Sequence, residues 1–250
     1  MQITVCVAVT PATDTKVKIG SDGRSLDPAD VSYELNPYDE LAVEEALRTV
    51  EAAGEGEVQI LTVGDGSQKE EVRKCLARGA HRATILKTSI ENADSASIAK
   101  ALADFIAQGE SQLVFLGKQA VDGDNGQVPS QLAVRLGWPV VTKISKLVIA
   151  GDGFSAEREI EGGIEKIEGS LPCVFSTEKG LNEPRYPKLK GIMQAKKKPL
   201  DEVEISLEPA KLLLDSLELP PARPAGRIIG EGLEAVDTLI DLLKNEAKVI

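Results

Sequence analysis

Residues 113–127 read LVFLGKQAVDGDNGQ, and this stretch decides the fold. Leu113 to Leu116 form a short apolar run, typical of a buried parallel strand, and a glycine-rich loop then leads into a helix expected to end near Leu136. Ligands of open α/β sheets bind at such strand-to-helix turns. The spacing fits neither a Walker loop nor G-x-G-x-x-G. Three glycines would still let backbone N–H groups meet a phosphate, while an ordinary turn is the alternative.

The chain before this stretch alternates strand and helix patterns. Short apolar runs at 3–9, 58–63 and 83–86 indicate buried strands. Helices are expected after Asn36 as N-cap, after a Ser67 capping box, and after Asp94 as N-cap. This alternation predicts an α/β fold: a mostly parallel sheet with helices on both faces.

The pattern changes after Trp138-Pro139. Strand-like runs at 144–150, 155–160 and 164–168 follow one another without a helix, which predicts antiparallel strands added to the sheet. Residues 183–226 show little periodicity and predict a long extended arm. We therefore expect an α/β domain with its antiparallel extension at 1–182, an extended arm at 183–226, and a last helix within 227–250.

The composition narrows the range of possible functions. The chain has 29 Lys and Arg against 40 Asp and Glu, so its net charge is −11, and only eight of its 250 residues are aromatic. An acidic chain poor in aromatic residues is a poor candidate for nucleic-acid binding. One histidine, His81, and three scattered cysteines exclude the usual zinc and disulfide frameworks. The N-terminus lacks a signal-peptide pattern and no apolar run is long enough to span a membrane, so we expect a cytoplasmic protein without membrane insertion.

The predicted arm has an unusual charge. Between Glu183 and Leu200 there are six basic residues and one acidic residue, a local charge of +5. A basic segment on an acidic body suits docking to an acidic partner, and a solvated loop is the alternative.

Other polar residues have plain structural explanations. We interpret the stretch Asn36 to Asp39 mainly as a helix N-cap. It can also belong to a ligand site, since strand-end loops of one sheet converge on one crevice. His81 follows Gly79 at a helix end and is expected at the surface. No set of residues suggests a catalytic centre, and we expect no metal site.

Several stretches together resemble a known family. They are Asn36 to Ala46, Gly117 to Ala120, Glu157 to Gly163, Leu181 to Leu189, and Ala195 to Lys198. In order and spacing the chain resembles the β subunit of electron transfer flavoprotein, from Ile3 to the final helix.

The resemblance implies an electron-carrying heterodimer, not a substrate-turnover enzyme. An α subunit would hold most of the FAD. The β subunit would bind AMP structurally in an α/β nucleotide-binding domain of the adenine-nucleotide-binding type at 1–182. Its arm at 183–226 would dock partners, and its helix at 227–250 would pack on the partner subunit or on the core. The implied nucleotide-binding residues are Ala8, Asn36, Pro37, Tyr38, Asp39, Val63, Gly117, Lys118, Gln119, Ala120, Val121, Asp122, Gly123, Asp124, Asn125, Gly126, Gln127 and Val128.

The resemblance also implies partners. Electrons would come from acyl-CoA or related dehydrogenases, as in fatty acid β-oxidation, and pass to a quinone oxidoreductase. Leu189 would anchor the dehydrogenase, beside Arg185, Tyr186, Lys188 and Lys190, and Glu159 would approach the flavin domain of the α subunit.

Two alternatives remain at this point. A branch of the same family holds a second FAD in place of AMP and splits the electron pair of NADH, and Asp122-Gly123-Asp124 matches its loop whereas Asn125-Gly126 does not. A universal-stress-type nucleotide-binding regulator is the alternative from another class.

Overall fold

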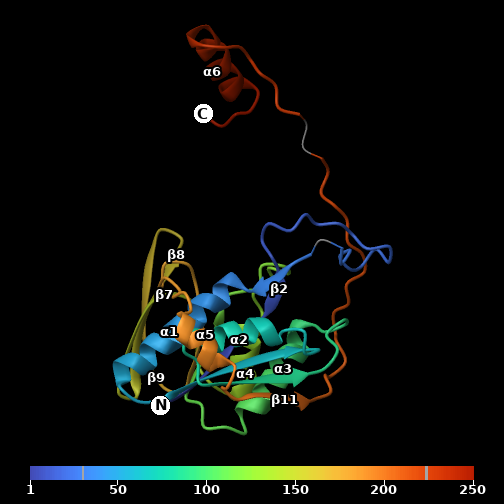
Figure 1. The fold of residues 1–250 in the computed structure, drawn as a ribbon. Coiled ribbons are helices and arrows are strands. Elements are labelled where there is room, and N and C mark those ends of the chain that lie inside the picture. Colours follow the sequence, from blue (N-terminus) through green and yellow to red (C-terminus); the bar gives the residue numbers. More distant parts are fainter. Residues whose placement is uncertain (30, 223–224) are drawn as a thin grey trace. The chain divides into compact units, whose positions relative to one another are not determined.

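The computed structural model describes residues 1–29, 31–222 and 225–250 (Figure 1). The chain divides into two compact units, Met1–Ser216 and Leu217–Ile250, and each is described by itself. Residues 223 and 224, in the predicted arm, lie outside the described residues.

The first unit is built on one mixed sheet. Within the described ranges its strands follow the order β11-β5-β4-β1-β6-β10-β7-β8-β9. The strands are β1 (Gln2–Cys6), β4 (Glu57–Gly64), β5 (Arg82–Lys87), β6 (Leu113–Gly117), β7 (Val140–Ala150), β8 (Gly153–Ile160), β9 (Gly163–Ser170), β10 (Cys173–Thr177) and β11 (Leu200–Glu204). All pairs from β11 to β7 are parallel, whereas β7, β8 and β9 pair antiparallel. The predicted parallel sheet with an antiparallel extension is confirmed.

Helices cover both faces of the parallel part, because strands buried on both sides need two apolar layers. Side chains of α1 (Pro37–Ala53), α2 (Lys69–Arg78) and α5 (Leu189–Ala195) pack on one face. Side chains of α3 (Ser95–Ile106) and α4 (Val128–Leu136) pack on the other. The three cysteines, Cys6, Cys75 and Cys173, are free thiols buried in these two layers.

Two local predictions need correction. The run at 3–9 is not one strand: β1 ends at Cys6, and β2 (Val9–Pro11) pairs with β3 (Tyr33–Leu35) in a separate small sheet. Ser67 does not cap α2: the N-cap position is Gln68, which makes no side-chain cap, and the Ser67 amide donates to Asp65 in the turn before the helix. In contrast, Asp94 caps α3 as predicted, accepting from the Ser97 amide at 2.8 Å.

The segment after β10 is more regular than predicted. Residues 183–226 do not form a wholly extended arm, because they contain α5 and the edge strand β11. Each end of α5 is fastened to a helix of the domain. Before α5, Arg185 binds Glu44 and Glu51 of α1. After it, the Lys198 ammonium donates to the carbonyls of Leu76 and Ala80 at the end of α2, at 2.9 and 2.6 Å.

The second unit contains a 3₁₀ turn (Leu233–Ala235) and α6 (Val236–Asn245), which confirms a last helix but one shorter than the predicted 227–250. Val236, Leu239 and Ile240 of α6 are exposed, although they recur at helical spacing. The domain boundaries drawn from the sequence and the packing of this helix on a partner stay predictions.

Replacing Gly191 tests how α5 is held. A Cβ at Gly191 would meet the carbonyl oxygen of Ala77 in α2 far closer than any real Cβ contact. We expect Gly191→Ala to force the two helices apart and to cost about 1–3 kcal/mol, as overpacking does. Urea unfolding gives the cost, and faster amide exchange in 189–195 locates it. In the control Gly163→Ala the new methyl group has no neighbour within 4 Å; equal effects in the two variants would refute the close packing.

Candidate functional site

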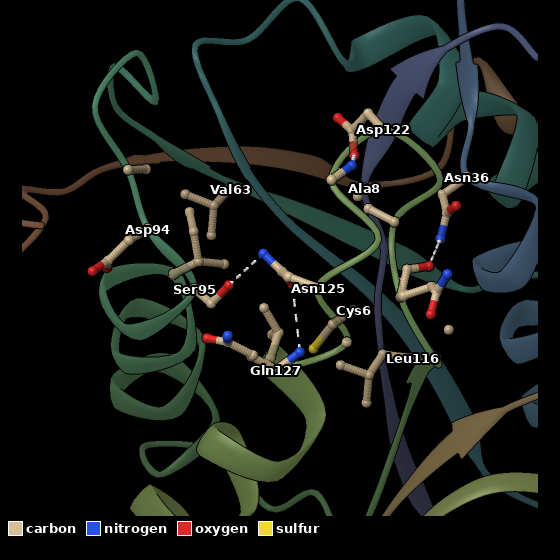
Figure 2. A pocket seen from close by; sticks show the side chains of 18 of the residues that line it. Cys6, Ala8, Asn36, Val63, Asp94, Ser95, Leu116, Asp122, Asn125 and Gln127 are labelled. Carbon is tan, nitrogen blue, oxygen red and sulfur yellow. Dashed lines mark hydrogen bonds between the residues drawn. The ribbon is translucent and has the colours of Figure 1, made fainter. Parts of the chain in front are cut away.

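A pocket of about 570 Å³ lies where the parallel strands end (Figure 2). Its walls come from the ends of β1, β4 and β6, from the start of α3, and from the loop between β6 and α4. The chain leaves β1 toward β4 on one side and returns as β6 on the other, so the strand order reverses at this point. Open α/β sheets bind ligands at this reversal, in pockets of roughly 300–1,000 Å³.

The Asp39 carboxylate holds the two strand ends at the base of the pocket. It accepts from the backbone amide of Ala8 at 2.8 Å and from that of Gly117 at 2.6 Å. Burial raises the pKa of Asp39 to about 6, although these two amides oppose the shift. A Cβ on Gly117 would lie 2.6 Å from the carboxylate oxygen, so only glycine allows β6 to approach so closely.

Asn36 fastens the glycine-rich loop to the start of α1. It occupies the predicted N-cap position, but its side chain makes no capping hydrogen bond. Instead its amide donates to the carbonyl of Gln119 at 2.9 Å and accepts from the amide of Val121 at 3.3 Å. The bond to Gln119 is visible in Figure 2. Asn36 therefore occupies the cap position while its side chain shapes the pocket wall, and its contact with a ligand stays a prediction.

Polar and apolar side chains both line the pocket. Asn125 donates to the Ser95 hydroxyl at 3.0 Å, and the two side chains point toward each other in Figure 2. Gln127 stands at the start of α4, and the apolar lining includes Val63, Ile90 and Ile98, with β4 and β6 on opposite sides of β1. Among the residues that the structure describes, no Lys or Arg side chain lines this pocket.

Most of the predicted nucleotide-binding residues come together here. Those that line the pocket are Ala8, Asn36, Asp39, Val63, Gly117, Gln119, Ala120, Asp122, Gly123, Asp124, Asn125, Gly126, Gln127 and Val128. Pro37, Tyr38, Lys118 and Val121 are not among the lining residues. The Lys118 ammonium instead lies 4.6 Å from the ring centroid of Tyr38 and 2.7 Å from the Glu178 carboxylate.

Sequence reasoning missed part of the wall. The missed lining residues are Cys6, Val7, Val9, Gln68, Ile90, Ala93, Asp94, Ser95, Ile98, Leu102, Leu116, Pro129 and Leu212 to Leu214. Asp94 was recognised only as a helix cap. Its position after the third predicted strand was the available signal, because loops that follow parallel strands converge on the same edge. The sequence pattern around Leu212 to Leu214 has no such signal.

The predicted docking residues occupy two different environments. Leu189 and Tyr186 are 75% and 91% exposed, and Lys188 and Lys190 are also exposed. Arg185 is instead paired with two carboxylates of α1. Hydrogen bonds to Glu51 and Glu44 raise the pKa of Arg185.

The remaining predicted polar residues lie at the surface. Glu159 is exposed on β8, and its predicted contact with a partner stays a prediction. His81 is exposed, as expected, and its ring nitrogen accepts from the Val58 amide at 3.0 Å. Among the helices in the described part of the chain, none is long and apolar enough to cross a membrane.

The fold and the pocket define a class: an open, mostly parallel α/β protein with a small-molecule pocket at its strand reversal. A family model described as the electron transfer flavoprotein domain matches residues 25–208. The chain is 40% identical to the electron transfer flavoprotein subunit beta of Bacillus subtilis, over 95% of this chain and 96% of that protein.

Other relatives agree. The corresponding subunit of Bradyrhizobium diazoefficiens is 36% identical over the full length of both chains. The mitochondrial one of Oryza sativa subsp. indica is 38% identical over 98% of this chain and 99% of that protein. The chain therefore belongs to the family of electron transfer flavoprotein β subunits, which confirms the resemblance and sets aside the universal-stress-type regulator.

Replacing Asp39 tests the base of the pocket. Asp39→Asn leaves one backbone amide facing an NH₂ group, so we expect a loss of about 1–3 kcal/mol in the free energy of unfolding. A carboxyl whose pKa is raised on folding contributes stability that is complete below its unfolded pKa and is lost as the pH rises through its folded pKa, here about 6.

The difference in free energy of unfolding between the wild type and Asp39→Asn should therefore shrink by roughly 1 kcal/mol between pH 5 and pH 7.5. Only the wild type loses stability over this pH range. Urea unfolding at both pH values measures it. Glu55→Gln, just beyond the end of α1, is the control. A penalty for Asp39→Asn that stays constant with pH would contradict the raised pKa.

Proposed function

We propose that this chain is the β subunit of a heterodimeric electron carrier and binds AMP in the pocket at the strand reversal. Its α partner holds most of the FAD. Electrons enter from acyl-CoA-type dehydrogenases and leave to a quinone oxidoreductase. The observation that carries the nucleotide assignment is the pocket at the strand reversal, whose lining combines a glycine-rich loop and polar side chains with apolar side chains such as Val63, Ile90 and Ile98.

The residues present suit a nucleotide in two respects. The glycine-rich loop and the start of α4 line the pocket, and backbone N–H groups of such a loop and helix start can bind phosphate without a cationic side chain. The nearby acids are engaged within the protein. Asp39 is held by two amides, Asp122 accepts from the Gly123 amide, and Asp124 accepts from Gln119. The apolar side chains of the lining, including Val63, suit a base.

Released nucleotide identifies the ligand. The chain is co-expressed with its α partner, and the purified heterodimer is denatured so that its nucleotides can be separated by mass. We expect one FAD and one AMP per heterodimer. Two FAD would replace the AMP proposal by a bifurcating carrier that oxidises NADH, and a heterodimer with one FAD and no second nucleotide would refute the pocket assignment.

The exposed face of α5 supports a docking role. Leu189 is exposed at the start of this helix, between Lys188 and Lys190. The helix is fastened to α1 and α2, so an apolar side chain is presented from a rigid base inside a basic rim. Apolar anchors of this kind carry most of the binding energy in many interfaces. Because Arg185 is bound to Glu44 and Glu51, it positions the segment rather than adding to the rim.

Leu189→Ala tests the docking role. We expect it to slow reduction of the heterodimer's flavin by an acyl-CoA dehydrogenase about tenfold, because one hot-spot side chain contributes more than 1 kcal/mol. The wild-type rate should also fall as salt rises, because the basic rim attracts an acidic partner. Stopped-flow measurement of flavin reduction gives both rates.

Val134→Ala, an exposed apolar position on α4, is the matched control and should leave the rate unchanged. Flavin content and heterodimer size must stay as in the wild type. A Leu189→Ala rate equal to that of the control would overturn the docking assignment.

A further inference from the structure

Residues 205–216 cross the helix α3 side of the domain and reach the pocket. The Ile205 amide bonds to the Lys87 carbonyl at the end of β5. Glu208 then lies 3.8 Å from the Lys100 ammonium of α3, and Asp215 is bound by Arg24. We call residues 205–216 the strap. It is tied at intervals, and the middle of it borders the pocket.

One carboxylate fixes the middle of the strap. Asp94 uses Oδ1 to cap α3, and its Oδ2 accepts from the amides of Lys211 and Leu212 at 2.8 and 3.2 Å. The Ser97 amide, with those of Lys211 and Leu212, lowers the pKa of Asp94 to about 2. The carboxylate is therefore charged at neutral pH, which is the form that accepts from both strap amides.

Three consecutive leucines follow this attachment. Leu212, Leu213 and Leu214 line the pocket, yet they are 68%, 71% and 55% exposed. They are therefore three adjacent, largely exposed apolar side chains at the pocket. They line the same pocket as Val63, at the end of β4, and Ile90. The polar loop that suits a phosphate comes from the other side of β1, after β6.

We propose that Leu212 to Leu214, positioned by Asp94, form the wall against which the base of the bound nucleotide packs. The inference rests on the proposed nucleotide pocket and adds to it a specificity element that comes from the strap. The leucines recognise an apolar aromatic face rather than a charge. A ligand with a purine base gains from them, and a sugar phosphate without a base does not.

Two variants test the leucine wall without disturbing the fold of the domain. Asp94→Asn keeps a good N-cap for α3, because Asn caps as well as Asp, but removes the acceptor for Lys211 and Leu212. Leu213→Ser removes one apolar side chain that is already mostly exposed. Val134→Ser, on α4 and outside the pocket lining, is the matched control.

The experiment follows nucleotide exchange in the intact heterodimer. Protein loaded with labelled AMP is mixed with excess unlabelled AMP, and retained label is counted over time. We expect both variants to release AMP about tenfold faster than the wild type, and the control to match the wild type. Ribose 5-phosphate should half-displace labelled AMP from Leu213→Ser at a concentration about tenfold lower than from the wild type. The reason is that AMP loses the contact of its base with Leu213, whereas ribose 5-phosphate has no base to lose.

Each other outcome is decisive. Exchange rates equal to the wild type in both variants would overturn the wall. Faster AMP exchange would also overturn it if the ribose 5-phosphate concentration for half-displacement stayed as in the wild type. The leucines would then act on the whole ligand and not on its base. Loss of the α subunit from Leu213→Ser, with unchanged exchange, would make the strap a subunit contact instead. A wild-type heterodimer that retains no labelled AMP would refute the nucleotide pocket itself.

Discussion

A buried carboxylate between two backbone amides is the constraint on which the rest of this structure depends. Asp39 joins the loop after β1 to the end of β6, the two strands between which the strand order reverses. The ionised form is costly here, since burial raises the pKa of Asp39, and the two amides recover part of that cost. Because Asp39 and Asn36 stand in the same turn, one short segment sets both the width of the crevice and the course of the loop beside it.

The chain after β10 connects features that lie far apart on the domain. It leaves the middle of the sheet, passes α1 and α2 with α5 between its attachments, and becomes the edge strand β11. It then continues as the strap to the pocket. The proposed docking helix and the proposed base wall are thus parts of one continuous segment, with a sheet strand between them. A strand paired along its whole length isolates one end from small movements of the other.

Much of the fold followed from local pattern. Apolar runs and caps such as Asp94 marked the parallel half, and the glycine-rich loop marked the pocket edge. The central strand β10 was not recognised, because Cys173–Thr177 follows β9 after two residues with no helix between them. α5 has only seven residues and contains Gly191, so its stability comes from packing on α2 rather than from its own sequence. The strap leucines reach the pocket through tertiary bonds to Asp94, which no local pattern encodes.

The burial of all three cysteines lowers their reactivity toward oxidants such as peroxide. The thiolate is the form that peroxide attacks, and it exists only near or above the thiol pKa. Burial raises the pKa of Cys75 and of Cys173 to about 12, and raises that of Cys6 as well. Reduced flavins that meet oxygen are a source of peroxide. Buried, protonated thiols react slowly with peroxide, so Cys6, Cys75 and Cys173 are poor targets for sulfenic acid formation.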